Sequence, residues 1–203
     1  TAHLRQGANV AGLLVGNGFF NQVEFGGKRS YGAPGAICAL KIEFEDGLSQ
    51  TVVSDDAWRA AAGPIVYNNV FGGETYDARR ELPGWDRPGF DSAAWAAAVV
   101  LPQLSARLQA QMMPPIRRIE IIKPKTLTKP KPGSWIYDLG LNIAGWARLR
   151  VHAPAGTEVQ LRFAEVLTPE GALDPVTTHV KLTHNMLAQK DIYICRGGDP
   201  EEW

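Results

Sequence analysis

Residues 37–53 read ICALKIEFEDGLSQTVV and contain the clearest strand pattern in the chain. Apolar side chains alternate with charged ones from Leu40 to Glu45, which is the period-two pattern of a strand with one face in water. Asp46-Gly47 follows at once, the strongest short-range signal for a tight hairpin turn, and residues 48–53 return as the partner strand. The stretch therefore predicts a half-solvated antiparallel pair.

The rest of the chain predicts more short strands separated by turns. With 21 glycines and 14 prolines among 203 residues, the composition favours many short strands over long helices. Residues 158–163 alternate again, directly after a turn at residues 154–157. We expect an all-β protein with two antiparallel β-sandwich (jelly-roll-like) domains, the first lacking its earliest strands and the second incomplete.

Two short segments resemble each other and interrupt this pattern. Residues 54–58 read SDDAW and residues 91–95 read DSAAW, so small or acidic residues precede a tryptophan in both. An Asp or Ser at such a place can accept a hydrogen bond from a free backbone N–H of the next turn. We predict a capped helical turn at each segment, followed by an inward-facing tryptophan.

The sequence changes in character between Lys123 and Gly133, where three prolines and four lysines occur. Proline removes a ladder donor, so this segment is not a central strand. A nucleic-acid patch is one interpretation of the lysines, but the zero net charge favours a solvated connector. We predict a first domain over residues 1–122, a linker over 123–133 and a partial second β-domain over 134–203.

Composition also excludes several classes of partner. Lys+Arg and Asp+Glu both number 21, so no basic surplus indicates nucleic acid. No apolar run approaches the roughly 20 residues of a membrane-spanning helix. We therefore expect neither nucleic acid nor membrane as a partner. Cys38 and Cys195 lie far apart with no histidine at metal-ligand spacing, which predicts neither a disulfide nor a zinc site.

Residues 71–79 read FGGETYDAR, and residues 83–86 read PGWD. We interpret this glycine-rich region as too irregular for an ordinary core strand. Its rings could cover the C–H face of a sugar, and its carboxylates could accept from sugar hydroxyls. The predicted carbohydrate site comprises Glu74, Tyr76, Asp77, Arg79 and Trp85. The structural alternative is that a carboxylate pairs with Arg79 to hold the loop while the rings fill the core.

The same region offers oxygen ligands for a metal ion. Asn68, Asn69 and Asp77 carry hard oxygen atoms, which suit calcium better than a transition metal. A complete site would need roughly six to eight oxygens, more than the sequence identifies. We expect no required cofactor, with calcium as an optional ligand at these three residues.

Taken in order, the motifs resemble those of bacterial α-L-rhamnosidases. Residues 16–20, 54–58 and 73–86 resemble the N-terminal β-sandwich of that family. Residues 138–146 and 162–167 resemble the β-domain that follows it. Leu141 and Phe163 stand where that family usually has glutamine and histidine, which removes two polar groups from the second domain.

The resemblance implies a parent protein that hydrolyses terminal α-L-rhamnose with inversion, through paired acidic residues in a helical toroid. No long helical repeat occurs in this chain, so we expect it to contain no catalytic residue and to be inactive alone. Three roles stay open: a support for the catalytic helical domain, a binding module for L-rhamnose-type sugars that uses calcium in some relatives, and a structural interaction domain. The expected partners are a rhamnose-containing glycan or glycoside, the catalytic helical domain and, through exposed edge strands, a second copy.

Overall fold

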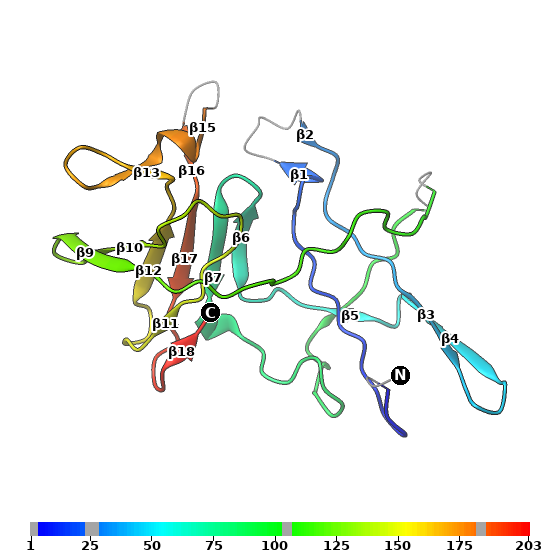
Figure 1. The fold of residues 1–203 in the computed structure, drawn as a ribbon. Helices are drawn as coiled ribbons and strands as arrows, with labels where there is room; N and C mark the ends of the chain where they lie inside the picture. The colour runs from blue at the N-terminus through cyan, green and yellow to red at the C-terminus, as the bar shows by residue number, and fades with distance from the viewer. Residues whose placement is uncertain (1–3, 23–28, 103–106, 182–185) are drawn as a thin grey trace. The chain divides into compact units, whose positions relative to one another are not determined.

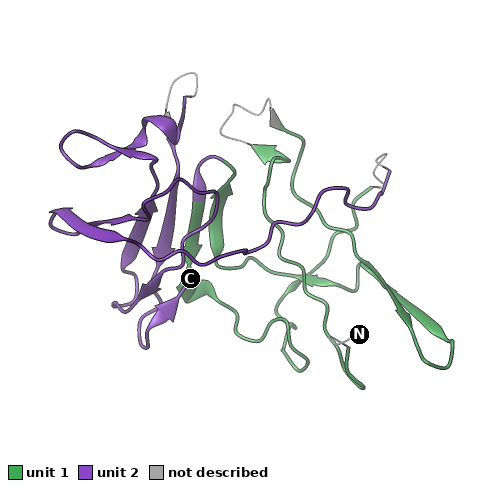
Figure 2. Ribbon diagram, viewed as in Figure 1, with its two compact units in different colours: residues 1–70, 74–104 green, residues 71–73, 105–203 purple. Residues whose placement is uncertain are grey.

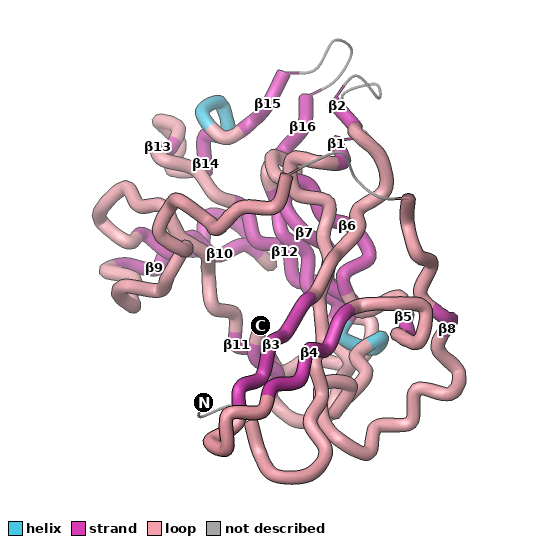
Figure 3. The backbone as a smooth tube through the Cα atoms, turned by 90° about the vertical axis from the view of Figure 1, so that its right-hand side faces the viewer, coloured by secondary structure: helices cyan, strands magenta, loops and turns pink. Residues whose placement is uncertain are grey.

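The computed structural model describes residues 4–22, 29–102, 107–181 and 186–203 (Figure 1). Within these ranges the regular structure is β-strand apart from two 3₁₀ helices, η2 (Ala78–Arg80) and η3 (Pro175–Thr177), which Figure 3 shows in cyan. The strand pairs with a determined register are antiparallel. The prediction of an all-β, antiparallel protein is therefore confirmed. None of the helices in the described part of the chain is long and apolar enough to cross a membrane.

The chain divides into two compact units, which Figure 2 colours separately. Unit 1 comprises residues 1–70 and 74–104, and unit 2 comprises residues 71–73 and 105–203. The boundary falls near residue 105, and the short loop 71–73 belongs to unit 2 although its flanking strands belong to unit 1.

Unit 1 is built from short strands. Its elements are β1 (Asn21–Gln22), β2 (Arg29–Ser30), β3 (Ala39–Glu43), β4 (Ser49–Val53), β5 (Arg59–Ala60), β6 (Ile65–Asn69), β7 (Gly73–Asp77, whose first residue belongs to unit 2) and β8 (Ala96–Ala97). The pairs are β1 with β2, β3 with β4, β5 with β8, and β6 with β7.

The β3–β4 pair is the hairpin that the alternating stretch predicts. Ala39 pairs with Val53 and Glu43 with Ser49. The turn is closed by the backbone N–H of Gly47, which donates to the Phe44 carbonyl at 3.0 Å, and Gly47 has a positive φ of 83°. Most side chains of both strands are exposed, so this hairpin contributes little to the core.

The two tryptophan segments form the capped turns that the sequence predicts. The Ala57 N–H donates to Asp55 Oδ1 at 3.0 Å, and the Ala93 N–H donates to Asp91 Oδ1 at 2.9 Å. Each turn leads into one strand of the β5–β8 pair, in which Arg59 lies opposite Ala97. Two similar local sequences therefore bring two distant segments of unit 1 into register.

Unit 2 contains the remaining strands: β9 (Thr126–Lys131), β10 (Ser134–Asp138), β11 (Arg150–Val151), β12 (Glu158–Arg162), β13 (Val166–Leu167), β14 (Leu173–Asp174), β15 (His179–Lys181), β16 (Met186–Ala188), β17 (Lys190–Ile194) and β18 (Glu201–Glu202). The pairs are β9–β10, β11–β18, β12–β17, β13–β14 and β15–β16. The core of unit 2 lies along β17, where Tyr193 is 1% exposed and Cys195, just beyond the strand, is 0% exposed.

Two expectations about local structure differ from the fold. Residues 126–131 lie within the predicted linker, yet they form β9, which is exposed along its whole length and has β10 as its partner. A register irregularity beside Pro130 accommodates the missing donor. Residues 73–77, interpreted as too irregular for an ordinary core strand, form β7, whose first residue, Gly73, has the positive φ of 85° that links the preceding turn to the strand.

Candidate functional site

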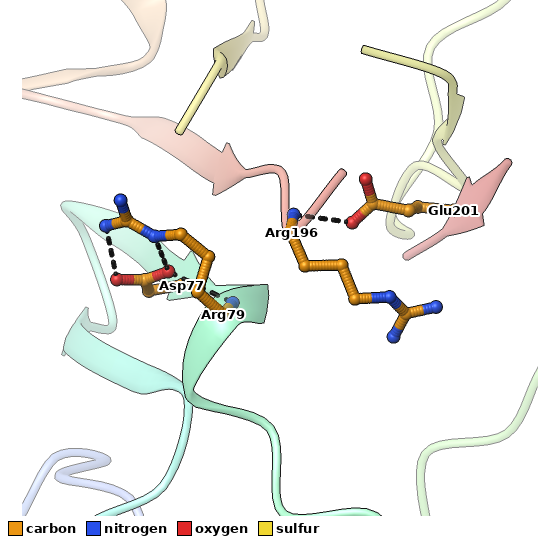
Figure 4. A network of polar contacts seen from close by, with 4 residues as sticks. All are labelled: Asp77, Arg79, Arg196 and Glu201. Carbon is orange, nitrogen blue, oxygen red and sulfur yellow. Dashed lines mark hydrogen bonds and ion pairs between the residues drawn. The ribbon is translucent and has the colours of Figure 1, made fainter. Parts of the chain in front are cut away.

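Asp77 and Arg79 form the clearest polar contact in unit 1. Arg79 donates from Nε to Asp77 Oδ1 and from Nη2 to Oδ2, both at 2.8 Å, as Figure 4 shows. The Arg79 backbone N–H also donates to Oδ1 at 3.2 Å, which makes Asp77 the N-cap of η2. These bonds, with the Arg79 side chain contributing most, hold the pKa of the Asp77 carboxyl below its usual range despite burial. The carboxylate therefore fixes the end of β7.

The aromatic members of the predicted carbohydrate site also contact unit 1 itself. The Tyr76 hydroxyl donates to Glu81 Oε1 at 3.1 Å. The Trp85 ring lies against Gly12 so closely that a Cβ at Gly12 would come within 2.5 Å of Cζ3. Glu74 is half-buried on β7. The Asp77–Arg79 pair agrees with the ion pair of the structural alternative, whereas the Tyr76 and Trp85 rings are only partly buried, and sugar binding at the five residues stays a prediction.

The asparagines assigned to calcium belong to a network of side-chain amides. The Asn17 backbone N–H donates to Asn68 Oδ1 at 2.8 Å, and Asn17 Nδ2 donates to the Asn68 carbonyl at 3.0 Å. Asn69 Nδ2 donates to Gln22 Oε1 at 3.2 Å, and both of these side chains are buried. Sequence reasoning missed this network, although the Gly16-Asn17-Gly18 motif marks one side of it.

No cluster of three or more His, Cys, Asp or Glu side chains suited to a metal ion occurs in the described part of the chain. Asn68 Oδ1 and both Asp77 oxygens already accept hydrogen bonds from protein groups. Calcium at Asn68, Asn69 and Asp77 stays a prediction, and binding there would require these contacts to rearrange or to share their oxygens with the ion.

Glu201 is a second buried carboxylate, which sequence reasoning did not identify. Its Oε2 accepts from the Arg196 N–H at 2.9 Å, as Figure 4 shows. Oε2 also accepts from the Tyr193 hydroxyl at 2.8 Å, and Oε1 accepts from the Gly197 N–H at 3.1 Å. Burial alone would raise the pKa of Glu201, but the three hydrogen bonds outweigh it and lower this pKa. Burial and the Glu201 charge together raise the pKa of the Cys195 thiol.

The two buried carboxyl groups are therefore held in the ionised form. A general acid in glycoside hydrolysis needs the opposite, a raised pKa that keeps its proton near neutral pH. Glu165, the acid in one of the family-like motifs, is exposed and accepts from Asn142 Nδ2 at 3.3 Å. That bond joins the two motifs of unit 2, residues 138–146 and 162–167.

Comparison with known proteins gives two family matches. The family model of the α-L-rhamnosidase N-terminal domain matches residues 1–120, and that of the bacterial α-L-rhamnosidase concanavalin-like domain matches residues 128–203. An α-L-rhamnosidase of Streptomyces avermitilis is 42% identical over all of this chain and 19% of its own length. One from Formosa agariphila is 35% identical over all of this chain and 22% of its own length.

Two solved structures resemble the fold. The α-L-rhamnosidase from Dictyoglumus thermophilum matches 84% of this chain and 19% of its own, at 34% identity and a TM-score of 0.75. The Streptomyces avermitilis α-L-rhamnosidase complexed with L-rhamnose matches 81% of this chain and 16% of its own, at 40% identity and a TM-score of 0.73. The chain spans about a fifth of the length of the curated relatives it matches.

Proposed function

This chain belongs to the α-L-rhamnosidase family, to its non-catalytic N-terminal region, and from that premise we propose that it supports a catalytic helical domain in a protein that hydrolyses terminal α-L-rhamnose. The chain itself breaks no glycosidic bond in this proposal. It supplies a β-scaffold beside the catalytic domain, whose acid–base pair belongs to another part of the protein.

The state of the buried carboxyl groups supports this proposal most directly. Asp77 and Glu201 are the buried acidic side chains among the described residues, and hydrogen bonds lower the pKa of both. An inverting glycosidase needs one protonated and one ionised carboxyl about 6.5–9.5 Å apart. Asp77 and Glu201 are both held as anions by arginine, tyrosine and backbone N–H donors, so the two do not supply such a pair.

An aryl α-L-rhamnoside assay tests the proposal. We expect no release of the aryl group by this chain between about pH 4 and 8, the range in which a catalytic carboxyl pair would act. In a whole protein that carries this chain and is active, D77N and E201Q should keep kcat within about threefold, whereas loss of a general acid or base typically lowers kcat at least about a hundredfold. Turnover by the chain alone would contradict the proposal, as would a hundredfold loss of kcat in either folded variant.

A second candidate function is binding of L-rhamnose by unit 1, at Glu74, Tyr76, Asp77, Arg79 and Trp85. It is favoured by the similarity to a protein that was solved as a complex with L-rhamnose. Calorimetric titration of the chain with L-rhamnose should then give saturable heat that Trp85→Ala abolishes and Trp95→Ala preserves. Trp95 is a matched control because it packs against Phe90, with ring centroids 5.4 Å apart.

The same titration tests whether sugar binding requires calcium. Repeated in the presence of a chelator, it should lose its heat if Asn68, Asn69 and Asp77 bind calcium beside the sugar, and keep it if they do not. If no heat of binding is measured with or without the chelator, the chain does not bind L-rhamnose, and support of the catalytic domain is the function that remains.

A further inference from the structure

The β9–β10 hairpin of unit 2 has two different faces. Tyr137 pairs with Leu127 and Ile136 pairs with Thr128, so Leu127, Trp135 and Tyr137 lie on one face and Ile136 lies on the other. Ile136 is 8% exposed, whereas Leu127, Trp135 and Tyr137 are 51%, 52% and 61% exposed. Ile136 on the inner face is therefore buried, and two aromatic rings on the outer face are half or more exposed to solvent.

The segment that contains this hairpin is also positively charged. Residues 123–138 carry four lysines and one aspartate, a net charge of +3 (4 − 1), in a chain whose net charge is zero. Lys129, two residues after Leu127 on β9, lies on the aromatic face, and Lys125 immediately precedes the strand, with its side chain beside Gly140. No ion pair with a carboxylate is formed by these four lysines in the part of the chain that the structure describes.

We propose that the outer face of the β9–β10 hairpin, defined by Leu127, Lys129, Trp135 and Tyr137, together with the adjacent Lys125, binds an acidic oligosaccharide whose sugar rings carry carboxylate groups. The rings of Trp135 and Tyr137 cover the C–H faces of two sugar units, and the lysine ammonium groups pair with the carboxylates. This surface is separate from the five residues of unit 1 and does not depend on rhamnose binding there.

Charge complementarity and spacing select this ligand. Trp135 and Tyr137 are two residues apart on one strand, about 6.6 Å along its length, so each ring can meet a different sugar of the same chain. Single-stranded nucleic acid also combines stacking with phosphate contacts. It is disfavoured here because the chain has no overall basic surplus and belongs to a family that acts on glycosides.

Calorimetric titration with an oligogalacturonate tests the proposal, because its fully methyl-esterified counterpart offers the same rings without charge. We expect binding of the acid form that weakens when salt rises from about 0.02 M to about 0.5 M. Trp135→Ala should weaken binding about tenfold through loss of ring contact. Lys129→Ala should weaken it severalfold and reduce its salt dependence.

Matched controls lie elsewhere on unit 2. Trp146→Ala removes a tryptophan that is 65% exposed, and Lys181→Ala removes an exposed lysine of β15, so neither should change binding. Thermal melts establish that each variant is folded. If Trp135→Ala does not fold, Lys129→Glu tests the proposal instead, because the reversed charge should weaken binding of the acid oligomer. The proposal is overturned by absence of binding, by equal binding of the esterified oligomer, by equal losses in the control variants, or by tighter binding of a single-stranded thymidine oligomer.

Discussion

A carboxylate as deeply buried as that of Glu201 is unfavourable unless protein groups replace the water it has lost. Here a tyrosine hydroxyl and two backbone N–H groups do so, and all three donors lie within eight residues of Glu201. The stacked rings of Tyr193 and Trp203, with centroids 5.4 Å apart, lie in the same segment. Glu201 therefore fixes the loop between β17 and β18 through charge-assisted bonds.

Glu201→Gln should destabilise the chain by about 1–3 kcal/mol, because the amide presents N–H groups where three donors already converge. Urea unfolding at neutral pH measures this change. Glu202→Gln is the control: Glu202 is the exposed neighbour and pairs with Arg148 at 3.4 Å, a contact worth at most about 1 kcal/mol. Equal losses in the two variants would contradict the assigned role of Glu201.

The pH dependence of the same variant follows from its lowered pKa. A carboxyl with a lower pKa in the folded state stabilises that state above its ordinary pKa of 4.5 and loses this contribution as pH falls through the folded-state pKa. The difference in unfolding free energy between the natural chain and E201Q should therefore shrink as pH falls below 4.5. A difference that is constant with pH would contradict the ionised state of Glu201.

Asp77→Asn tests the two hydrogen bonds that the Arg79 side chain donates to the Asp77 carboxylate. The amide cannot accept from both Nε and Nη2, and we expect a loss of about 1–2 kcal/mol, limited by the half-exposed guanidinium. The loss should diminish as pH falls below 3.8, because the pKa of Asp77 is lowered in the folded state. Glu43→Gln, which breaks an exposed pair with Lys41, should change stability by less than about 1 kcal/mol in urea unfolding.

At the scale of the element, β7 depends on the glycine at its start. Gly73 has a φ of +85°, and a Cβ there would lie 2.1 Å from the Lys190 carbonyl oxygen. The neighbouring Gly72 carbonyl accepts from the Lys190 N–H at 3.2 Å, so the loop 71–73 and the start of β17 lie in close backbone contact within unit 2. Glycine is required here both for its conformation and for the space.

Gly73→Ala should therefore destabilise the chain more than Gly84→Ala does. Gly84 has a φ of +81° but nothing within 4 Å of its added Cβ. Gly84→Ala therefore measures only the free-energy cost of placing a side chain on this backbone conformation, about 1–2 kcal/mol. The clash at Gly73 should add at least about 1 kcal/mol. Urea unfolding of both variants measures the difference, and equal losses would show that the Lys190 contact relaxes freely.

At the scale of the whole molecule, both units bury polar side chains. Those of unit 1 are Gln22, Asn69 and Asp77, and that of unit 2 is Glu201. Large apolar side chains also remain in solvent. Along residues 107–122 of unit 2, Ile116 is 93% exposed and Ile119 is 97% exposed. Large apolar side chains that are exposed in this way favour association.

We expect this chain to self-associate through that segment. Sedimentation should give an apparent mass that rises with protein concentration, and Ile119→Lys should lower it by placing charge where apolar contact forms. Leu14→Lys, at a side chain that is 69% exposed in unit 1, controls for a general effect of added charge. A strictly monomeric chain at high concentration would contradict the expectation.

Local features that depend on residues close together in the chain could be predicted from the sequence. The β3–β4 hairpin follows from alternation and Asp46-Gly47, the two Asp-capped turns follow from SDDAW and DSAAW, and the ordered motifs identify the family. The pairing of Asp77 with Arg79 was foreseen as an alternative because the two residues are only two apart. Such features depend on backbone hydrogen bonding within a few residues.

The fold, and not the sequence pattern, shows which distant segments are in contact. It paired Asn69 with Gln22 across 47 residues, placed Trp85 on Gly12, and put Tyr193 and two N–H groups around Glu201. It also made a strand of residues 126–131, whose single proline, Pro130, is tolerated because β9 pairs with β10 alone among the described strands. The physical reason is that a buried polar group must find its partner wherever the folded chain supplies one, and sequence spacing does not encode that meeting.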